Sequence, residues 1–301
     1  MAWHNLIIPM MLTGALTLAP GTAPSVARAT QGSTARREIS GQRLSQGCGR
    51  AAPKASATHL MVAGRRRQFI LTVPKGYRTK QPKWLVFAFH GRTDNNAKVR
   101  SYYDLERHAT YPTLFVYPSG LQDQSGRFTW SAPRDQASAL RDYAFFDALL
   151  AKIGNQYCIA LDHVYIVGHS LGAWFANSLA CARAARIRAV ATLGGSISAS
   201  ACSGAVAAMI AHNPKDRLVP FAGGQRVRDT FLKHNSLLED RGVRLAANDL
   251  NCRRYGSSSV RNPVLWCPHT HNDTWRGKYY PHHWPRSMGQ AIMTFFASLP
   301  G

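Results

Sequence analysis

One stretch, "VYIVGHSLGAWFANSLACA" from Val164 to Ala182, limits the fold more than any other part of the chain. Its first half is apolar and β-branched and its second half is an alanine-rich run, which predicts a buried strand that passes directly into a helix. Ser170 lies at the junction, in the pattern G-x-S-x-G. Small residues on both sides relieve the crowding of such a sharp turn, which lifts the hydroxyl above the sheet. The stretch therefore predicts a nucleophilic serine at the start of a helix.

The rest of the chain alternates between strand-like and helical segments. Apolar runs typical of buried strands are "KWLVFAFHG", "PTLFVYPSG", "DHVYIVG", "IRAVATLGGS", "AVAAMIAH" and "NPVLWC", and "THLMVAGRRRQFILTVP" predicts a hairpin. Helical patterns are "SALRDYAFFDALLAKIGNQY", the run after Ser170, "GGQRVRDTFLKHN" and "SMGQAIMTFFASL". This alternation predicts an α/β fold with a mostly parallel central sheet and helices on both faces. Ligands bind such sheets at the carboxyl ends of the strands, where Ser170 falls.

The start of the chain is typical of a targeting segment. Residues 1–29 contain the apolar run "LIIPMMLTGALTLA" and end on "ARA", the small-x-small pattern of a signal peptidase site. A membrane anchor is the alternative, but the run is short for a span and Pro9 interrupts it. We expect a secreted or periplasmic protein without stable membrane insertion, in which residues 30–58 are an extended lead-in and residues 59–301 one catalytic domain.

Six cysteines fit an exported protein, because an even number allows complete pairing in an oxidising compartment. The expected pairs are Cys252–Cys267, Cys181–Cys202 and Cys48–Cys158. No two cysteines form a C-x-x-C pair, which argues against zinc. His269 and His271, with Asp273, are an alternative metal site in H-x-H spacing. We expect no metal and no other cofactor.

The chain carries 37 lysine and arginine residues against 15 acidic ones, a formal net charge of +22. Such a field attracts polyanions: nucleic acid, anionic lipid or acidic cell-wall polysaccharide. A solvated surface without a particular partner is the alternative. The basic residues are scattered and no nucleic-acid motif accompanies them, so we expect no binding of nucleic acid. We also expect a monomer.

A serine hydroxyl is a weak nucleophile and needs a histidine base that is oriented by a carboxylate. On this fold the acid follows the serine and the histidine follows the acid. Asp216, in "AMIAHNPKDRLVP", lies just beyond a buried strand in a proline-containing loop and is the expected acid. The base is expected in "PHTHNDTWRGKYYPHHWPRSMG", the loop between the last strand and the closing helix. The first choice is His282, with His283 and His269 as alternates.

Acyl transfer also needs hydrogen-bond donors for the oxyanion. The segment "VFAFHGRTDN" ends a strand, so the amide of Arg92 or Thr93 is expected to point into the site. The residue after the nucleophile, Leu171, supplies the second amide.

From residue 46 to residue 298 the chain resembles the secreted α/β-hydrolase esterases that group feruloyl esterases with polyhydroxybutyrate depolymerases. The matching segments are "GCGR", "RQFILTVPKGY", "FAFHG", "YPSGL", Trp130 followed by Asp142-x-x-Phe145, "YCIALDHVYIVGHSLG", "LACARA", "RAVATLGGS", "KDRLVPFAGG" and "NPVLWC". The resemblance implies an α/β-hydrolase fold, a Ser–His–Asp mechanism and Asp216 as the acid. The base in these families often stands in H-x-W-P, which matches His282 to Pro285. Some feruloyl esterases carry it in Gly-Gly-His after "WC"; that motif is absent here, so His269 and His271 also stay candidates.

The resemblance implies an exported serine carboxylic-ester hydrolase that releases hydroxycinnamic or related acids from plant polysaccharide through an acyl-enzyme. A polyhydroxybutyrate depolymerase or a general short-chain esterase is the alternative, because the GHSLG box is closer to lipases than to the GFSYG-like forms of many feruloyl esterases. The alternative of another class is a non-catalytic, hydrolase-like module that binds glycans. Aromatic loop residues suit a hydroxycinnamoyl ring, or else close a core edge. The expected substrate-binding residues are Trp130, His169 and Trp284.

Overall fold

The computed structural model describes residues 38–39, 41–54, 58–131, 136–198, 202–245, 249–271, 274–275 and 278–300, with the backbone alone at 38–39, 136–139, 274–275 and 278–279. The expected signal peptide at 1–29, the first part of the lead-in and Asp273 lie outside the described residues. Residues 36–301 form one folded unit.

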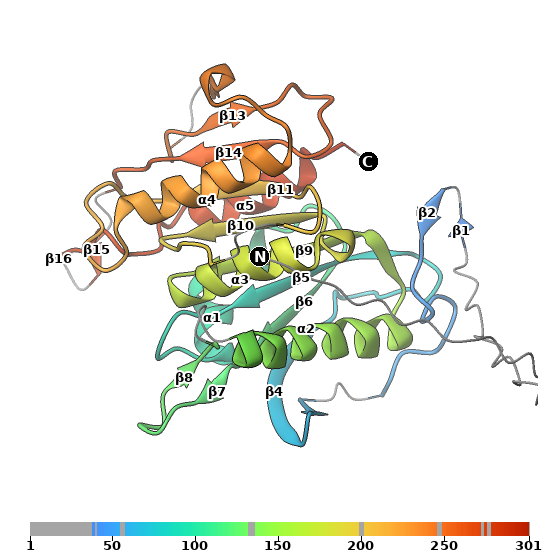
Figure 1. The fold of residues 1–301 in the computed structure, drawn as a ribbon. Helices are drawn as coiled ribbons and strands as arrows, with labels where there is room; N and C mark the ends of the chain where they lie inside the picture. Colours follow the sequence, from blue (N-terminus) through green and yellow to red (C-terminus); the bar gives the residue numbers. More distant parts are fainter. Residues whose placement is uncertain are drawn as a thin grey trace, which may run out of the picture. The chain divides into compact units, whose positions relative to one another are not determined.

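A ten-stranded sheet runs through this unit in the order β12-β13-β14-β11-β10-β9-β5-β6-β4-β3 (Figure 1). Its central strands, each parallel to the next, are β14 (Val264–Cys267), β11 (Ala207–Ala211), β10 (Ala189–Leu193), β9 (Ile159–His169), β5 (Lys83–Phe89) and β6 (Thr113–Pro118). Antiparallel strands close both edges: β4 (Arg65–Thr72) with β3 (His59–Val62), and β13 (Arg253–Tyr255) with β12 (Val243–Arg244). The mostly parallel sheet and the early hairpin predicted from the sequence are confirmed.

Helices cover both faces of the sheet, as the sequence predicted. They are α1 (Asn96–Tyr103), α2 (Gln136–Gln156), α3 (Leu171–Ala182), α4 (Phe221–His234) and α5 (Met288–Ala297). Successive side chains of a strand point to opposite faces. The buried strand β5 therefore gives Phe87 to a core cluster with α2, α3 and α4, and Val86 to a second cluster with α1 and α5. Figure 1 shows α2, α3 and α4 in front of the sheet.

Shorter elements complete the unit. They are the two-residue ladders β1 (Glu38–Ile39) with β2 (Gln42–Arg43), β7 (Leu121–Gln122) with β8 (Phe128–Thr129) and β15 (Thr274–Trp275) with β16 (Lys278–Tyr279), and the 3-10 turns η1 (Glu106–His108), η2 (Ala184–Arg186) and η3 (Glu239–Arg241). The ladder of β15 and β16 lies within the loop that carries the candidate histidines. No described helix combines the length and the apolar composition that a membrane span requires.

Residues 41–54, within the expected lead-in, are attached to the sheet. Ser45 N donates to Ile159 O at 3.0 Å, and a disulfide joins Cys48 to Cys158 just before β9. Disulfides also join Cys181 to Cys202 and Cys252 to Cys267. The structure thus contains the three pairs expected from the sequence.

Candidate active site

Ser170 occupies a strained turn between β9 and α3. Its φ of 55° is a value that a residue other than glycine adopts only when its neighbours enforce it. Ser170 N donates to Leu193 O at 3.0 Å, and Ser170 O accepts from Trp174 N at 3.0 Å. A Cβ at Gly168 would collide with the carbonyl oxygen of Gly172, and a Cβ at Gly172 would collide with carbonyl oxygens at the end of β5. Only glycine fits at both places, which is the physical reason for the G-x-S-x-G pattern.

The expected acid and the first-choice base lie in contact. His282 Nδ1 donates to Asp216 Oδ2 at 2.6 Å, and both side chains are buried. The other carboxylate oxygen, Oδ1, accepts from the amides of Leu218 and Val219 at 2.8 and 3.0 Å. Burial alone would raise the pKa of Asp216, but the hydrogen bonds from His282 and the two amides outweigh burial and hold that pKa below its usual value. Asp216 is therefore a carboxylate at neutral pH.

Gly194 places this pair beside the serine. It follows Leu193, whose carbonyl holds the Ser170 amide, and a Cβ at Gly194 would be 3.0 Å from His282 Cε1 and 3.4 Å from Asp216 Oδ2. The His282 imidazole therefore contacts Gly194, the residue next to Leu193, whose carbonyl accepts the hydrogen bond from the Ser170 amide. Among the described residues His282 Nε2 has no hydrogen-bond partner, Ser170 Oγ included. Such contacts are often open without substrate and close when substrate binds.

His169, between Gly168 and Ser170, holds the backbone of the expected base, His282, through a hydrogen bond. Its Nε2 donates to the backbone carbonyl of His282 at 2.8 Å, and only 7% of the residue is exposed. Burial lowers the pKa of His169 to about 3, helped by the nearby His282 ring, so the imidazole is neutral. The residue next to the nucleophile thus holds the backbone of the base. This corrects the expected substrate contact, because the donor nitrogen of His169 is already used inside the protein.

A further buried histidine, His212, was missed by the sequence analysis. Its Nε2 donates to Val219 O at 2.9 Å and lies 3.6 Å from Asp216 Oδ2, and burial lowers its pKa. It therefore braces the turn that carries Asp216 while staying neutral. Its position four residues before the acid, directly after β11, was the only sequence signal for this role.

The loop after β5 lies against the serine, since a Cβ at Gly91 would be 3.5 Å from Ser170 Cβ. His90 orders this loop: its Nδ1 donates to Gly91 O at 2.7 Å and its Nε2 accepts from Gly120 N at 2.9 Å. Burial lowers the pKa of His90 to about 4, so the ring stays neutral and can do both. The carbonyl and N–H of one trans peptide point in opposite directions. Holding Gly91 O against His90 therefore directs the Arg92 N–H away from that ring.

The two candidate oxyanion amides in this loop differ. Thr93 N donates to Phe128 O at 3.1 Å, so the expectation that Thr93 binds the oxyanion is wrong. The amides of Arg92 and Leu171 donate to none of the described residues. Leu171 is the first residue of α3, where backbone N–H groups have no partner within the helix.

The two tryptophans expected to bind substrate are buried instead. Trp130 is 2% exposed, stacks on Phe175 with ring centroids 4.8 Å apart, and donates from Nε1 to His90 O at 2.9 Å. Trp284 is 3% exposed and stacks on Tyr103 with centroids 3.9 Å apart. This is a correction: their rings face the protein interior and support the strand ends. The aromatic side chains close a core edge, the alternative considered for them.

The alternate histidines lie elsewhere in the same loop region. The His283 ring lies 5.8 Å from that of Tyr102, and the His269 ring lies 5.8 Å from that of His271. In the part of the chain that the structure describes, no three histidine, cysteine or acidic side chains gather as a metal site would require. The structure places the contact between Asp216 and His282 next to Gly194, the residue after the Leu193 carbonyl that holds the Ser170 amide.

Comparison with known proteins agrees with this arrangement. No protein-family model matches the chain. It is 30% identical to feruloyl esterase C of Emericella nidulans over 213 residues, 67% of this chain and 72% of that protein. It is 28% identical to feruloyl esterase D of Neurospora crassa over 253 residues, 77% of this chain and 83% of that protein.

Solved structures share the fold at low identity. A thermostable esterase matches with a TM-score of 0.60 and 14% identity, over 79% of this chain and 61% of that one. An acetyl xylan esterase from Aspergillus awamori matches with a TM-score of 0.55 and 13% identity, over 77% and 94%. The sheet order, the strained serine and the curated relatives lead to one conclusion: this chain is a carboxylic-ester hydrolase with the α/β-hydrolase fold and belongs to the feruloyl esterase family.

Proposed function

We propose that this chain is an exported serine esterase that cleaves hydroxycinnamoyl esters of plant polysaccharide, with Ser170 as nucleophile, His282 as base and Asp216 as acid. The observation that carries the proposal is the buried 2.6 Å contact between Asp216 and His282, beside the turn that bears Ser170. The feruloyl esterases among its relatives support the acyl group. The three disulfides support an oxidising compartment.

In the first step, Ser170 Oγ attacks the carbonyl carbon of the ester while His282 Nε2 accepts the serine proton. The carbonyl oxygen becomes an oxyanion that accepts hydrogen bonds from the amides of Arg92 and Leu171, at the positive end of α3. The ionised Asp216 stabilises the imidazolium and holds its orientation. His282 then gives the proton to the alcohol oxygen, the C–O bond breaks, and the acyl group stays on Ser170.

In the second step, water replaces the alcohol. His282 accepts a proton from the water as its oxygen attacks the acyl carbon, and the same two amides hold the second oxyanion. Return of the proton to Ser170 Oγ releases the carboxylic acid. The neutral His90 and His169 rings keep the oxyanion loop and the base in place through both steps, because neither ring changes its protonation.

Hydrolysis of methyl ferulate, p-nitrophenyl butyrate and polyhydroxybutyrate by the full chain tests the proposal. We expect the highest kcat/KM on methyl ferulate, and a loss of about 10⁴-fold or more in kcat for Ser170→Ala and for His282→Ala. His283→Ala and His269→Ala are matched controls from the same loop and should retain most of the activity. Hydrolysis of the polyester alone would overturn the acyl assignment.

Covalent labelling separates the nucleophile from the substrate. A fluorophosphonate should label Ser170 in the wild-type chain and not in Ser170→Ala, whichever ester is preferred. Full labelling of His282→Ala at the wild-type rate would show that another residue is the base.

A further inference from the structure

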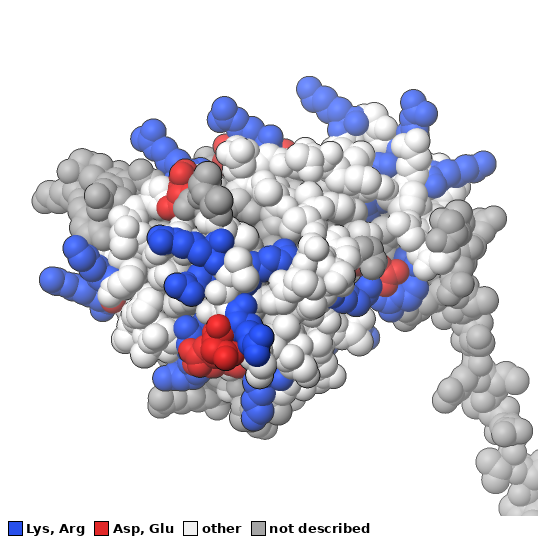
Figure 2. Space-filling model, turned by 90° about the horizontal axis from the view of Figure 1, so that it is seen from above, with Lys and Arg blue, Asp and Glu red and all other residues white. Residues whose placement is uncertain are grey.

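The excess positive charge is not used by the ester chemistry. Every acidic side chain that the structure describes, apart from Asp249, lies in an ion pair or, for Asp216, on His282. The chain has more than twice as many cationic as acidic residues, so many exposed cations have no acidic partner. Figure 2 shows lysine and arginine side chains at many separate places on one face, and acidic side chains in a few places only.

Four exposed cations follow one another from the site along a single stretch of chain. Lys215 and Arg217 flank Asp216 in the loop after β11, and α4 begins four residues after Arg217 and carries Arg226 and Lys233. None of the four has an acidic partner among the described residues. We call Lys215, Arg217, Arg226 and Lys233 the basic track.

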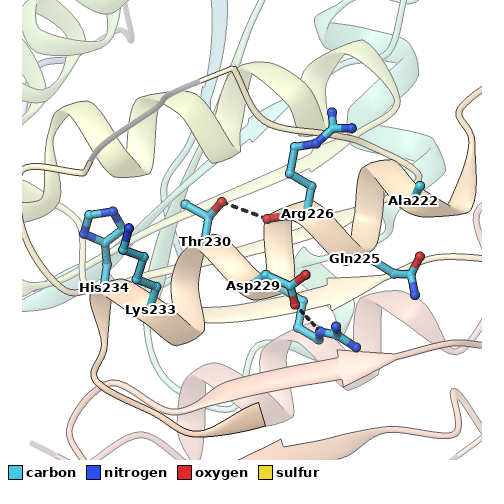
Figure 3. A pocket seen from close by; sticks show the side chains of 8 residues that line it. Ala222, Gln225, Arg226, Asp229, Thr230, Lys233 and His234 are labelled. Atoms are coloured by element: carbon cyan, nitrogen blue, oxygen red, sulfur yellow. Dashed lines mark hydrogen bonds and ion pairs between the residues drawn. The ribbon is translucent and has the colours of Figure 1, made fainter.

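Two members of the track, Arg226 and Lys233, line an open hollow of about 580 Å³ on the surface of α4, whose other lining side chains lie between Ala222 and His234 (Figure 3). Within it Arg228 is already paired with Asp229 and Glu239, so Arg226 and Lys233 are the cations left for a ligand. These two lie seven positions apart, about two helical turns or about 10 Å along the axis, and therefore on the same side of α4. In Figure 3 the Arg226 side chain extends away from the helix.

We propose that the basic track binds an acidic polysaccharide, and that the ester presented to Ser170 is carried by that polymer. The fork of an arginine guanidinium matches a uronate carboxylate, and a row of like charges attracts a polyanion over several ångströms. The side-chain amide of Gln225 suits a hydrated sugar surface, and Thr230, whose hydroxyl donates to Arg226 O at 2.8 Å, can still accept a hydrogen bond from a sugar. Among the described residues that line the hollow there is no phenylalanine, tyrosine or tryptophan, the side chains that most often stack on nucleic-acid bases. The ester part of this inference rests on the proposed function, whereas the binding part does not.

Binding of sodium polygalacturonate to the full chain, measured by isothermal titration calorimetry, tests the track. The variant Arg226→Gln/Lys233→Gln should weaken binding about 2- to 30-fold, since each exposed contact contributes modestly. The matched control is Lys75→Gln/Arg78→Gln, which removes two exposed cations from the loop between β4 and β5, away from the strands β11 and β14 on which α4 packs. That control should bind as the wild type does. Binding should also weaken between about 20 mM and about 300 mM NaCl, because salt screens exposed charges.

Three results would overturn the proposal: equal weakening in both double variants, equally tight binding of a neutral arabinan, or tighter binding of duplex DNA. Neither double variant touches the catalytic residues, so kcat/KM on methyl ferulate should stay at the wild-type value in both. A chain that binds polygalacturonate through the track but hydrolyses no ferulate would refute the proposed function and leave the track intact. A chain that hydrolyses methyl ferulate without binding the polymer would refute the track alone.

Discussion

Gly194→Ala tests how closely the site is built around one backbone position. The new methyl group would lie 3.0 Å from His282 Cε1, 3.1 Å from its Nδ1 and 3.4 Å from Asp216 Oδ2. Carbon atoms in ordinary contact are about 3.5 to 4.0 Å apart, so the imidazole must move by about 0.5 to 1 Å. A misplacement of about 1 Å costs about 100-fold in rate. We therefore expect kcat to fall about 10- to 100-fold, an increase of about 1.4 to 2.7 kcal/mol in the barrier.

The same substitution also strains the backbone, and a control separates the two effects. Gly194 has a φ of 61°, where alanine costs roughly 1–2 kcal/mol of unfolding free energy. Gly64, in the turn between β3 and β4, has a φ of 72° with nothing within 4 Å of its Cβ position. Gly64→Ala should therefore show a similar loss in urea unfolding but a normal kcat on p-nitrophenyl butyrate.

The two variants together separate displacement of the His282 ring from backbone strain as the cause of a lower kcat. Reduced kcat with unchanged KM in Gly194→Ala, and wild-type kcat in Gly64→Ala, is the expected pattern. If Gly194→Ala keeps its kcat, the ring is not held against this glycine and the geometric argument is wrong. If Gly64→Ala loses kcat to the same extent, backbone strain and not the contact with His282 is responsible.

His169→Phe should lower kcat about tenfold or more, because the His282 carbonyl loses its donor, and His169→Gln should recover part of the loss with KM unchanged in both. The folded pKa values of His169 and His90, about 3 and about 4, lie below the unfolded value, so the unfolded state binds protons first as the pH falls below about 6.5. Unfolding free energy from urea titrations should therefore drop by about 2.5 kcal/mol for each of these two histidines between about pH 7 and pH 4.5, and His169→Phe should remove the share of about 2.5 kcal/mol that belongs to His169. Replacing Cys48 and Cys158 together by alanine should lower the unfolding free energy by about 4 to 5 kcal/mol, because this disulfide closes a loop of 110 residues; an unchanged thermal midpoint would contradict this.

The sequence predicted the sheet and the serine turn because both depend on local patterns. Continuous apolar runs mark strands that are buried on both faces, and the two glycines around Ser170 are required by backbone contacts within a few residues. Asp216 could be predicted because it lies in the short loop that follows one such strand. The choice of His282 among several loop histidines needed the family resemblance, since loop residues carry no periodic pattern.

The roles of neighbouring residues could not be predicted, because they depend on contacts between distant segments. His169 was expected to meet substrate, but its donor nitrogen points to a carbonyl 113 residues away in sequence. Trp130 and Trp284 were expected to bind the aromatic ring of the substrate. Both indole rings are instead buried in the core, where their apolar surface is removed from water. Thr93 and Arg92 are equivalent in sequence, and only the hydrogen bond to Phe128 distinguishes them.

The two edges of the sheet have a consequence for behaviour at high concentration. One edge strand, β12, has two residues and the other, β3, has four, and arginines stand at positions 65, 66, 244, 253 and 254 on these strands or on their partners. Short edge strands expose few unpaired backbone N–H and C=O groups, and the arginines on them repel the same edge of another molecule. At high concentration, pairing between the edge strands of neighbouring molecules, which would lead to fibres, is therefore disfavoured. Part of the arginine excess thus keeps the protein dispersed in solution.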